Sequence, residues 1–177
     1  LAYEREGRHT EALEHHLAHI DAMRRLHGAD AFPLAAAHNN VCVAFIRLER
    51  HAEALPHCER ALAILEQARD PTPTVIAELH NTHGGVLSLL GRDDEGAAAF
   101  LRSRAAWREA MGPDSLDESS PMMNLAELYG RGGRSAESCA LYREALAIRE
   151  AALPDGDARV QSARAGVARC NRAPRPR

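Results

Sequence analysis

Lysine is absent from this chain of 177 residues, so all 22 of its basic side chains are arginines. Aromatic residues make up only 4% of the sequence, and alanine and leucine carry the apolar content, which favours helices over sheets. No run of 18 or more apolar residues occurs and no signal-peptide pattern is present, so we expect no membrane-spanning helix. The formal charge of −3, without a concentrated basic face, excludes nucleic acid as an expected partner.

Cysteine is scarce: the four cysteines are too few for a disulfide scaffold and lack the paired spacing of a metal site. Cys42 and Cys58 fall on facing helices and could approach each other, but we expect buried thiols there. Cys139 is expected to be more exposed. This use of cysteine predicts a reducing compartment, the cytoplasm.

Catalytic motifs are missing too. The chain has no G-x-S-x-G, no phosphate-binding loop, no H-E-x-x-H and no kinase signature, so we do not expect an enzyme. His15 and His19, and also His80 and His83, have spacings that can chelate zinc or nickel. However, His16, His19, His80 and His83 occupy columns held by packing residues in other parts of the chain, and no further ligand completes a set. We therefore expect no metal and no cofactor.

A short motif returns at a fixed interval. RHTEAL at 8–13 matches RHAEAL at 50–55, and GRDDEG at 91–96 and GRSAES at 133–138 follow in phase. The arginines stand at 8, 50, 92 and 134, so the period is 42 residues with no insertion or deletion. A fixed period of this length predicts a solenoid of repeated helical units.

Each period reads as two helices, A and B, joined by a turn at the arginine. We expect A helices over 32–48, 74–90 and 119–130, and B helices over 51–68, 93–111 and 135–152. Thr10, Thr74 and Ser135 are the predicted N-caps. Residues 1–172 form one array in this prediction: a partial repeat (1–30), three full repeats (31–73, 74–115, 116–157) and a terminal helix (158–172). Residues 173–177 are expected to be a disordered tail. The chain begins in mid-motif at Leu1, which suggests a fragment of a longer protein.

The helix pairs resemble tetratricopeptide repeats of the longer type found in kinesin light chains and in many bacterial signalling proteins. NNVCVAF at 39–45, MNLAELY at 123–129 and LYREALAI at 141–148 carry the resemblance. It implies an all-α fold, a right-handed α-solenoid of antiparallel helix hairpins. It also implies a protein-interaction scaffold that binds a peptide or a partner domain in a concave groove lined by the A helices.

One stripe of each A helix lies opposite its apolar stripe. At 100° per residue Ala36, Asn40, Val43 and Arg47 share one side of the first full A helix, roughly 180° from the core. The resemblance implies that this stripe faces the ligand, with Asn40 and Asn124 binding its backbone and Arg47 and Arg131 available for a carboxylate. The predicted peptide-binding residues are Asn40, Val43, Arg47, Glu78, Thr82, Asn124, Glu127 and Arg131. The alternative is that this side of the A helices is a solvent-exposed surface that binds no ligand.

Two other functions compete with peptide binding. Self-association is the first, because Leu13, Leu17 and Ile20 would be exposed if the helix that precedes them were incomplete. A regulatory sensor domain of a bacterial serine/threonine kinase or transcriptional regulator is the second, by family analogy alone.

Overall fold

The computed structural model describes residues 8–172, and every regular element in this range is a helix. The elements are α2 (His9–His27), α3 (Pro33–Arg47), α4 (His51–Gln67), α5 (Pro73–Leu89), α6 (Asp93–Met111), the short 3-10 helix η1 (Leu116–Glu118), α7 (Ser119–Arg131), α8 (Ser135–Ala152) and α9 (Ala158–Arg172). The all-α prediction is confirmed, and the helix bounds agree with the sequence to within one or two residues. The predicted helix end at 1–6 and the tail at 173–177 lie outside the described residues.

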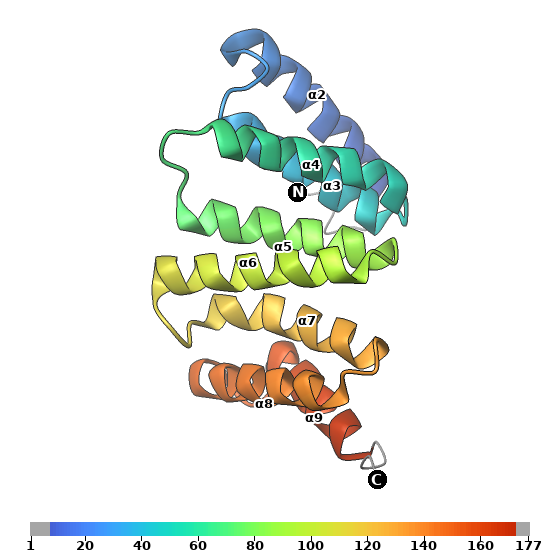
Figure 1. Cartoon of the computed structure of the whole chain (residues 1–177). Coiled ribbons are helices and arrows are strands. Elements are labelled where there is room, and N and C mark those ends of the chain that lie inside the picture. The colour runs from blue at the N-terminus through green and yellow to red at the C-terminus, as the bar shows by residue number, and fades with distance from the viewer. Residues whose placement is uncertain (1–7, 173–177) are drawn as a thin grey trace.

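The helices form a single stack in which each one packs against the next in the chain (Figure 1). Contacts also join α3 to α5 and α5 to α7, whereas no comparable contact joins α4 to α6 or α6 to α8 within residues 8–172. The stack therefore curves with the odd-numbered helices on its inner side. None of the helices in this range is both long enough and apolar enough to cross a bilayer.

The repeated arginine closes each turn between helices. The backbone N–H of Arg50 donates to the Phe45 carbonyl oxygen at 3.0 Å, and Arg92 and Arg134 make the same bond to the residues five earlier. The residue before each arginine has a positive φ: +58° at Glu49, +76° at Gly91 and +78° at Gly133. This left-handed position explains why glycine recurs there.

The arginine side chain also organises the start of the B helix. Arg50, Arg92 and Arg134 each bond a glutamate three residues later (Glu53, Glu95 and Glu137). These bonds hold the pKa of each glutamate below its usual value. The predicted caps at Thr10, Thr74 and Ser135 are wrong, because all three lie inside their helices and none of these helices has a side-chain cap bond.

The apolar core consists of two clusters. One is built from α2 to α5 around Leu34, Val41 and Ile64, and the other from α6 to α9 around Phe100, Met122 and Leu125. The α5–α6 hairpin joins them, with small residues where its backbones approach most closely. A Cβ at Gly84 would lie 2.8 Å from the Phe100 ring and 3.0 Å from the Gly96 carbonyl oxygen, so glycine is required at this contact.

The prediction of buried thiols is wrong. Cys42 and Cys58 form a disulfide, and Cys139 and Cys170 form a second one. The first disulfide joins α3 to α4 within one hairpin. The corresponding residues of the next repeat, 42 positions later, are Gly84 and Phe100. The second joins α8 to α9. The sequence placed Cys42 and Cys58 on facing helices but gave no sign that they are oxidised, and it did not indicate the pairing of Cys139 with Cys170.

Two predictions about α2 are also wrong. Leu13 and Ile20 are buried rather than exposed, and only Leu17 keeps a partly open side chain, at 38% exposure. His19 is exposed and His16 half-buried, so His19 is not the packing residue its column suggested. The helix α3 covers the apolar side of α2, which accounts for the buried leucine and isoleucine.

Candidate functional site

The eight predicted binding residues lie on α3, α5 and α7, the helices on the inner side of the curve. Six of them are exposed, and Val43 and Thr82 are half-buried. None contributes to either apolar cluster. The angular spacing along each helix therefore distinguished this surface from the core correctly. We call this surface the inner face. It consists of Asn40, Val43, Arg47, Glu78, Thr82, Asn124, Glu127 and Arg131.

Hydrogen bonds already engage part of the inner face. The Asn124 side-chain N–H group donates to the Asn81 side-chain oxygen at 3.0 Å, which links α7 to α5. The Thr82 hydroxyl donates to the Glu78 backbone oxygen of its own helix at 3.1 Å. The asparagine pair leaves one amide oxygen and one NH₂ group without a hydrogen-bond partner among residues 8–172, and these suit the backbone of an extended chain.

Arg131 is less available than the sequence suggested. Its guanidinium donates to the Ser88 hydroxyl at 2.6 Å and lies 3.3 Å from an Asp93 carboxylate oxygen. The charge of Arg131 is therefore balanced within the array. Its predicted role as a partner for a ligand carboxylate needs the Asp93 contact to open.

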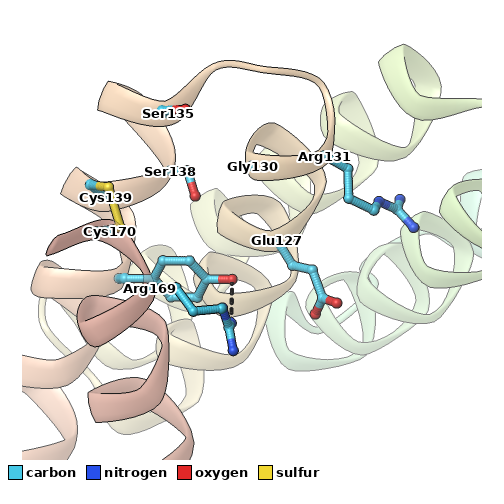
Figure 2. Close-up of a pocket in the computed structure, with 9 residues that line it drawn as sticks. Glu127, Gly130, Arg131, Ser135, Ser138, Cys139, Arg169 and Cys170 are labelled. Carbon is cyan, nitrogen blue, oxygen red and sulfur yellow. Dashed lines mark hydrogen bonds between the residues drawn. A yellow bond between two sulfur atoms is a disulfide. The ribbon is translucent and has the colours of Figure 1, made fainter. Parts of the chain in front are cut away.

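Two cavities on this side of the stack repeat the 42-residue period. The α5–α7 pocket has a volume of about 230 Å³, and the α7–α9 pocket, drawn in Figure 2, about 340 Å³. Six lining positions of the first recur in the second, as the pairs Gly85 and Glu127, Ser88 and Gly130, Leu89 and Arg131, Phe100 and Tyr142, Glu127 and Arg169, and Leu128 and Cys170. One feature of the repeat therefore makes both pockets, and Glu127 and Arg131 line both of them.

The α7–α9 pocket is rigid on its α8–α9 side. The Cys139–Cys170 disulfide forms part of its wall (Figure 2). On the α7 side the Ser138 hydroxyl donates to the Ala126 carbonyl oxygen at 2.6 Å. Arg169 donates to the Tyr142 hydroxyl at 3.0 Å. In Figure 2 Arg131 points away from this group, toward α5 and α6.

Sequence reasoning missed the contribution of the B helices and of α9. Phe100 and Tyr142 line the pockets from α6 and α8, and Arg169 does so from α9. The period contains the missing signal, because adding 42 to Glu127 gives Arg169.

A histidine pair lines a separate cavity of about 370 Å³ between α2, α3 and α4. His38 Nδ1 and His57 Nδ1 lie 3.1 Å apart, so one ring donates and the other accepts. Burial, together with the charges of His57 and Arg60, lowers the pKa of His38 to about 4, and burial lowers that of His57. Both rings are therefore neutral at pH 7, and Arg24 and Arg60, which line the same cavity, are each paired with an aspartate, Asp21 and Asp30.

One acidic cluster has metal-ligand spacing. Oxygen atoms of Asp114, Glu118 and Glu144 lie within 4.8 Å of one another. Two arginines already form ion pairs with this cluster: Arg108 donates to Glu118 at 2.8 Å, and Arg104 donates to Glu144. The cluster works as an ion-pair network that joins α6, η1 and α8.

Comparison with family models identifies one family for this chain. The family model described as "Tetratricopeptide repeat" matches residues 1–67 and 75–151. The TPR-like repeats described for a kinesin light chain of Podosopora anserina superpose with a TM-score of 0.78 at 17% identity, over 96% of this chain and 80% of that one. BtubC (BKLC) from P. vanneervenii superposes with a TM-score of 0.77 at 20% identity, over 99% of this chain and 80% of that one. At these identities the two structures are similar in fold alone. No protein with a curated description matches.

Proposed function

Since this chain belongs to the tetratricopeptide repeat family, we propose that it binds an extended segment of a partner protein along the inner face. Tetratricopeptide folds generally mediate protein–protein interaction, and scaffolds of this kind are typically not enzymes. The observation that carries the proposal is the recurrence of one pocket at a 42-residue interval, with Glu127 and Arg131 shared by both copies. A ligand that repeats at regular steps, such as an extended peptide, matches a surface with regular pockets.

Three features support a peptide over a compact ligand. Both cavities are open to solvent, and the asparagine pair beside the α5–α7 pocket, which Asn124 lines, offers an amide oxygen and an NH₂ group. Phe100 and Tyr142 provide flat apolar floors at matching positions. Amide groups that bind backbone and apolar floors that bind alternate side chains are the two components of extended-peptide recognition.

The test is selection of random dodecapeptides displayed on phage against the immobilised chain. Peptides that enrich are synthesised, and their affinity is measured by fluorescence anisotropy for the wild type and for Asn40→Ala plus Asn124→Ala. Removing side-chain hydrogen bonds worth about 0.5–1.5 kcal/mol each should weaken binding about tenfold.

Glu109→Ala plus Arg143→Ala is the matched control, because both residues are exposed and lie on the B helices α6 and α8. This variant should bind as the wild type does. Equal affinity of all three proteins for every enriched peptide would rule out the inner face as the binding surface.

Self-association is the second candidate. Leu26 is 75% exposed and Leu17 38% exposed on α2, and Phe32 is 39% exposed just before α3. Burial of Leu13 and Ile20 makes this apolar area smaller than the sequence suggested. Light scattering over a concentration series tests it: a constant monomer mass would exclude self-association.

The predicted cytoplasmic location stays a proposal, as does the division into repeats at 31–73, 74–115 and 116–157. The two disulfides weigh against the cytoplasm, because such bonds persist mainly in oxidising compartments. Alkylation of the protein in intact cells, followed by mass spectrometry, distinguishes the two states: four labelled cysteines would indicate a reducing environment.

A further inference from the structure

We propose that the α7–α9 pocket recognises a mixed-charge segment, with a basic side chain at Glu127 and an acidic side chain at Arg169. The inference rests on the proposed function and names the chemistry of the partner. Glu127 and Arg169 occupy the same position of successive A-type helices and line the same pocket (Figure 2). They give this part of the groove one negative and one positive side.

The carboxylate of Glu127 carries an uncompensated charge. It is exposed, and no ion pair or hydrogen bond engages it within residues 8–172. The nearest cation on the same helix, Arg131, is held by Asp93 and Ser88 on the α5–α6 side. Glu127 is therefore open to a ligand ammonium or guanidinium group.

The guanidinium of Arg169 is fixed but not neutralised. It donates to the Tyr142 hydroxyl at 3.0 Å and lies 5.4 Å from the centre of that ring. A phenol holds the arginine in place and leaves its positive charge available, since no carboxylate pairs with it in the described part of the chain. Tyr142 is only 4% exposed, so the support itself does not move.

The setting of the two charges makes them selective. The helix α9 lies close against Tyr142 because Gly166 has no side chain there, and the Cys139–Cys170 disulfide fixes the end of the same helix. A preorganised pair of opposite charges favours a complementary pair and repels a ligand with two like charges. On α5 the position that corresponds to Glu127 is Gly85, so the negative charge of this pocket comes from α7 alone.

The order of the charges along the groove predicts how a bound segment is oriented. From α7 to α9 the charges that line the pocket without an ion pair among the described residues are Glu127 and then Arg169. A bound segment therefore places its basic residue over α7 and its acidic residue over α9.

The test repeats the dodecapeptide selection on the wild type and on the charge-swapped variant Glu127→Arg plus Arg169→Glu. The best wild-type peptide is then synthesised with its basic and acidic residues exchanged. We expect the swapped protein to lose about tenfold in affinity for the original peptide and to regain it with the exchanged peptide. The swap Glu109→Arg plus Arg143→Glu on the B helices should change neither affinity.

Three outcomes overturn the inference. Wild-type selection could enrich peptides without a basic and an acidic residue, the swapped protein could bind the original peptide as well as the wild type does, or the exchanged peptide could fail to restore binding. If the double variant does not fold, the single variant Arg169→Gln replaces it, with its fold checked by circular dichroism. This variant should weaken only the contact between Arg169 and the acidic residue of the peptide. If Asn40→Ala plus Asn124→Ala lowers affinity while the charge swap does not, the proposed function stands and this inference fails.

Discussion

At the residue scale, two adjacent glycines in α5 have opposite surroundings. A Cβ at Gly84 would meet the Phe100 ring and the Gly96 carbonyl oxygen, whereas a Cβ at Gly85 would meet nothing within 4 Å. Both residues lie in the middle of a helix, where glycine costs about 0.5–1 kcal/mol relative to alanine. Alanine substitution at the two positions therefore distinguishes the effect of helix propensity, which both share, from the effect of packing, which only Gly84 has.

Gly84→Ala should destabilise the array by about 1–3 kcal/mol, because an aromatic ring and a backbone oxygen would have to move. Gly85→Ala should stabilise it by about 0.5–1 kcal/mol, because the helix gains propensity and nothing is displaced. Urea unfolding followed by circular dichroism measures both. A stabilising Gly84→Ala would contradict the close packing of the α5–α6 hairpin.

A second residue-scale prediction concerns His80 on α5. Burial, with Arg102 and His83 nearby, lowers the pKa of this imidazole to about 4, and its Nδ1 is buried without a hydrogen-bond partner. The unfolded chain takes up a proton near pH 6.5 while the folded chain stays neutral down to about pH 4. Stability therefore falls as the pH drops from 7 to 5.

His80→Gln should reduce this loss, so the difference between the urea midpoints at pH 7 and pH 5 becomes smaller than in the wild type. The exposed His19→Gln is the matched control and should keep the wild-type difference. Identical pH profiles for His80→Gln and the wild type would show that this histidine takes no part in acid destabilisation.

Single residues also mark how far the sequence could predict the site. The spacing of Asn40, Val43 and Arg47 predicted correctly that they lie outside the apolar core, because helical geometry alone decides which side of a helix a residue takes. The bond from Asn124 to Asn81 could not be predicted, since it depends on the distance between two helices 43 residues apart. The same holds for Cys139 and Cys170, whose approach depends on how α9 packs against α8.

At the element scale, α9 depends on few apolar contacts. Val160 and Ala163 are its buried apolar anchors, and polar bonds hold the rest: Arg164 to Glu150, and the Arg159 carbonyl oxygen to Arg149. The Cys139–Cys170 disulfide pins the last turn of this helix to α8. The polar sequence predicted a helix here but not the covalent bond that holds it.

Removing that bond should loosen α9 more than any other helix. In Cys139→Ser plus Cys170→Ser, amide hydrogen exchange should accelerate in α9 and leave α3 and α4 unchanged, because α9 has few buried apolar anchors and its ion pair from Arg164 to Glu150 is exposed and weak. Hydrogen-exchange mass spectrometry resolves the helices. The matched control, Cys42→Ser plus Cys58→Ser, should perturb α3 and α4 instead. Uniform acceleration along the chain would contradict a local role for the second disulfide.

At the scale of the whole molecule, the array is two apolar clusters joined by a glycine-lined hairpin. The period of 42 predicted the stack, the turns and the helix order, because each repeat packs only on its neighbours. It could not predict the division of the core, which arises where Gly84 and Gly96 replace larger side chains. The repeated motif thus determines the helices and turns, whereas the residues that differ between repeats determine how the apolar core is divided.

The two disulfides have a mechanical consequence when the chain is pulled from its ends. The bond at Cys42–Cys58 shields a segment of 16 residues from tension, and the bond at Cys139–Cys170 shields one of 31. Reduction should therefore lengthen the fully stretched chain by roughly 50 Å and roughly 100 Å respectively, at about 3.3 Å per residue. Optical-tweezer extension before and after reductant measures both steps. In the oxidised state residues 42–58 and 139–170 cannot extend, so all of the extension comes from the residues outside these two loops.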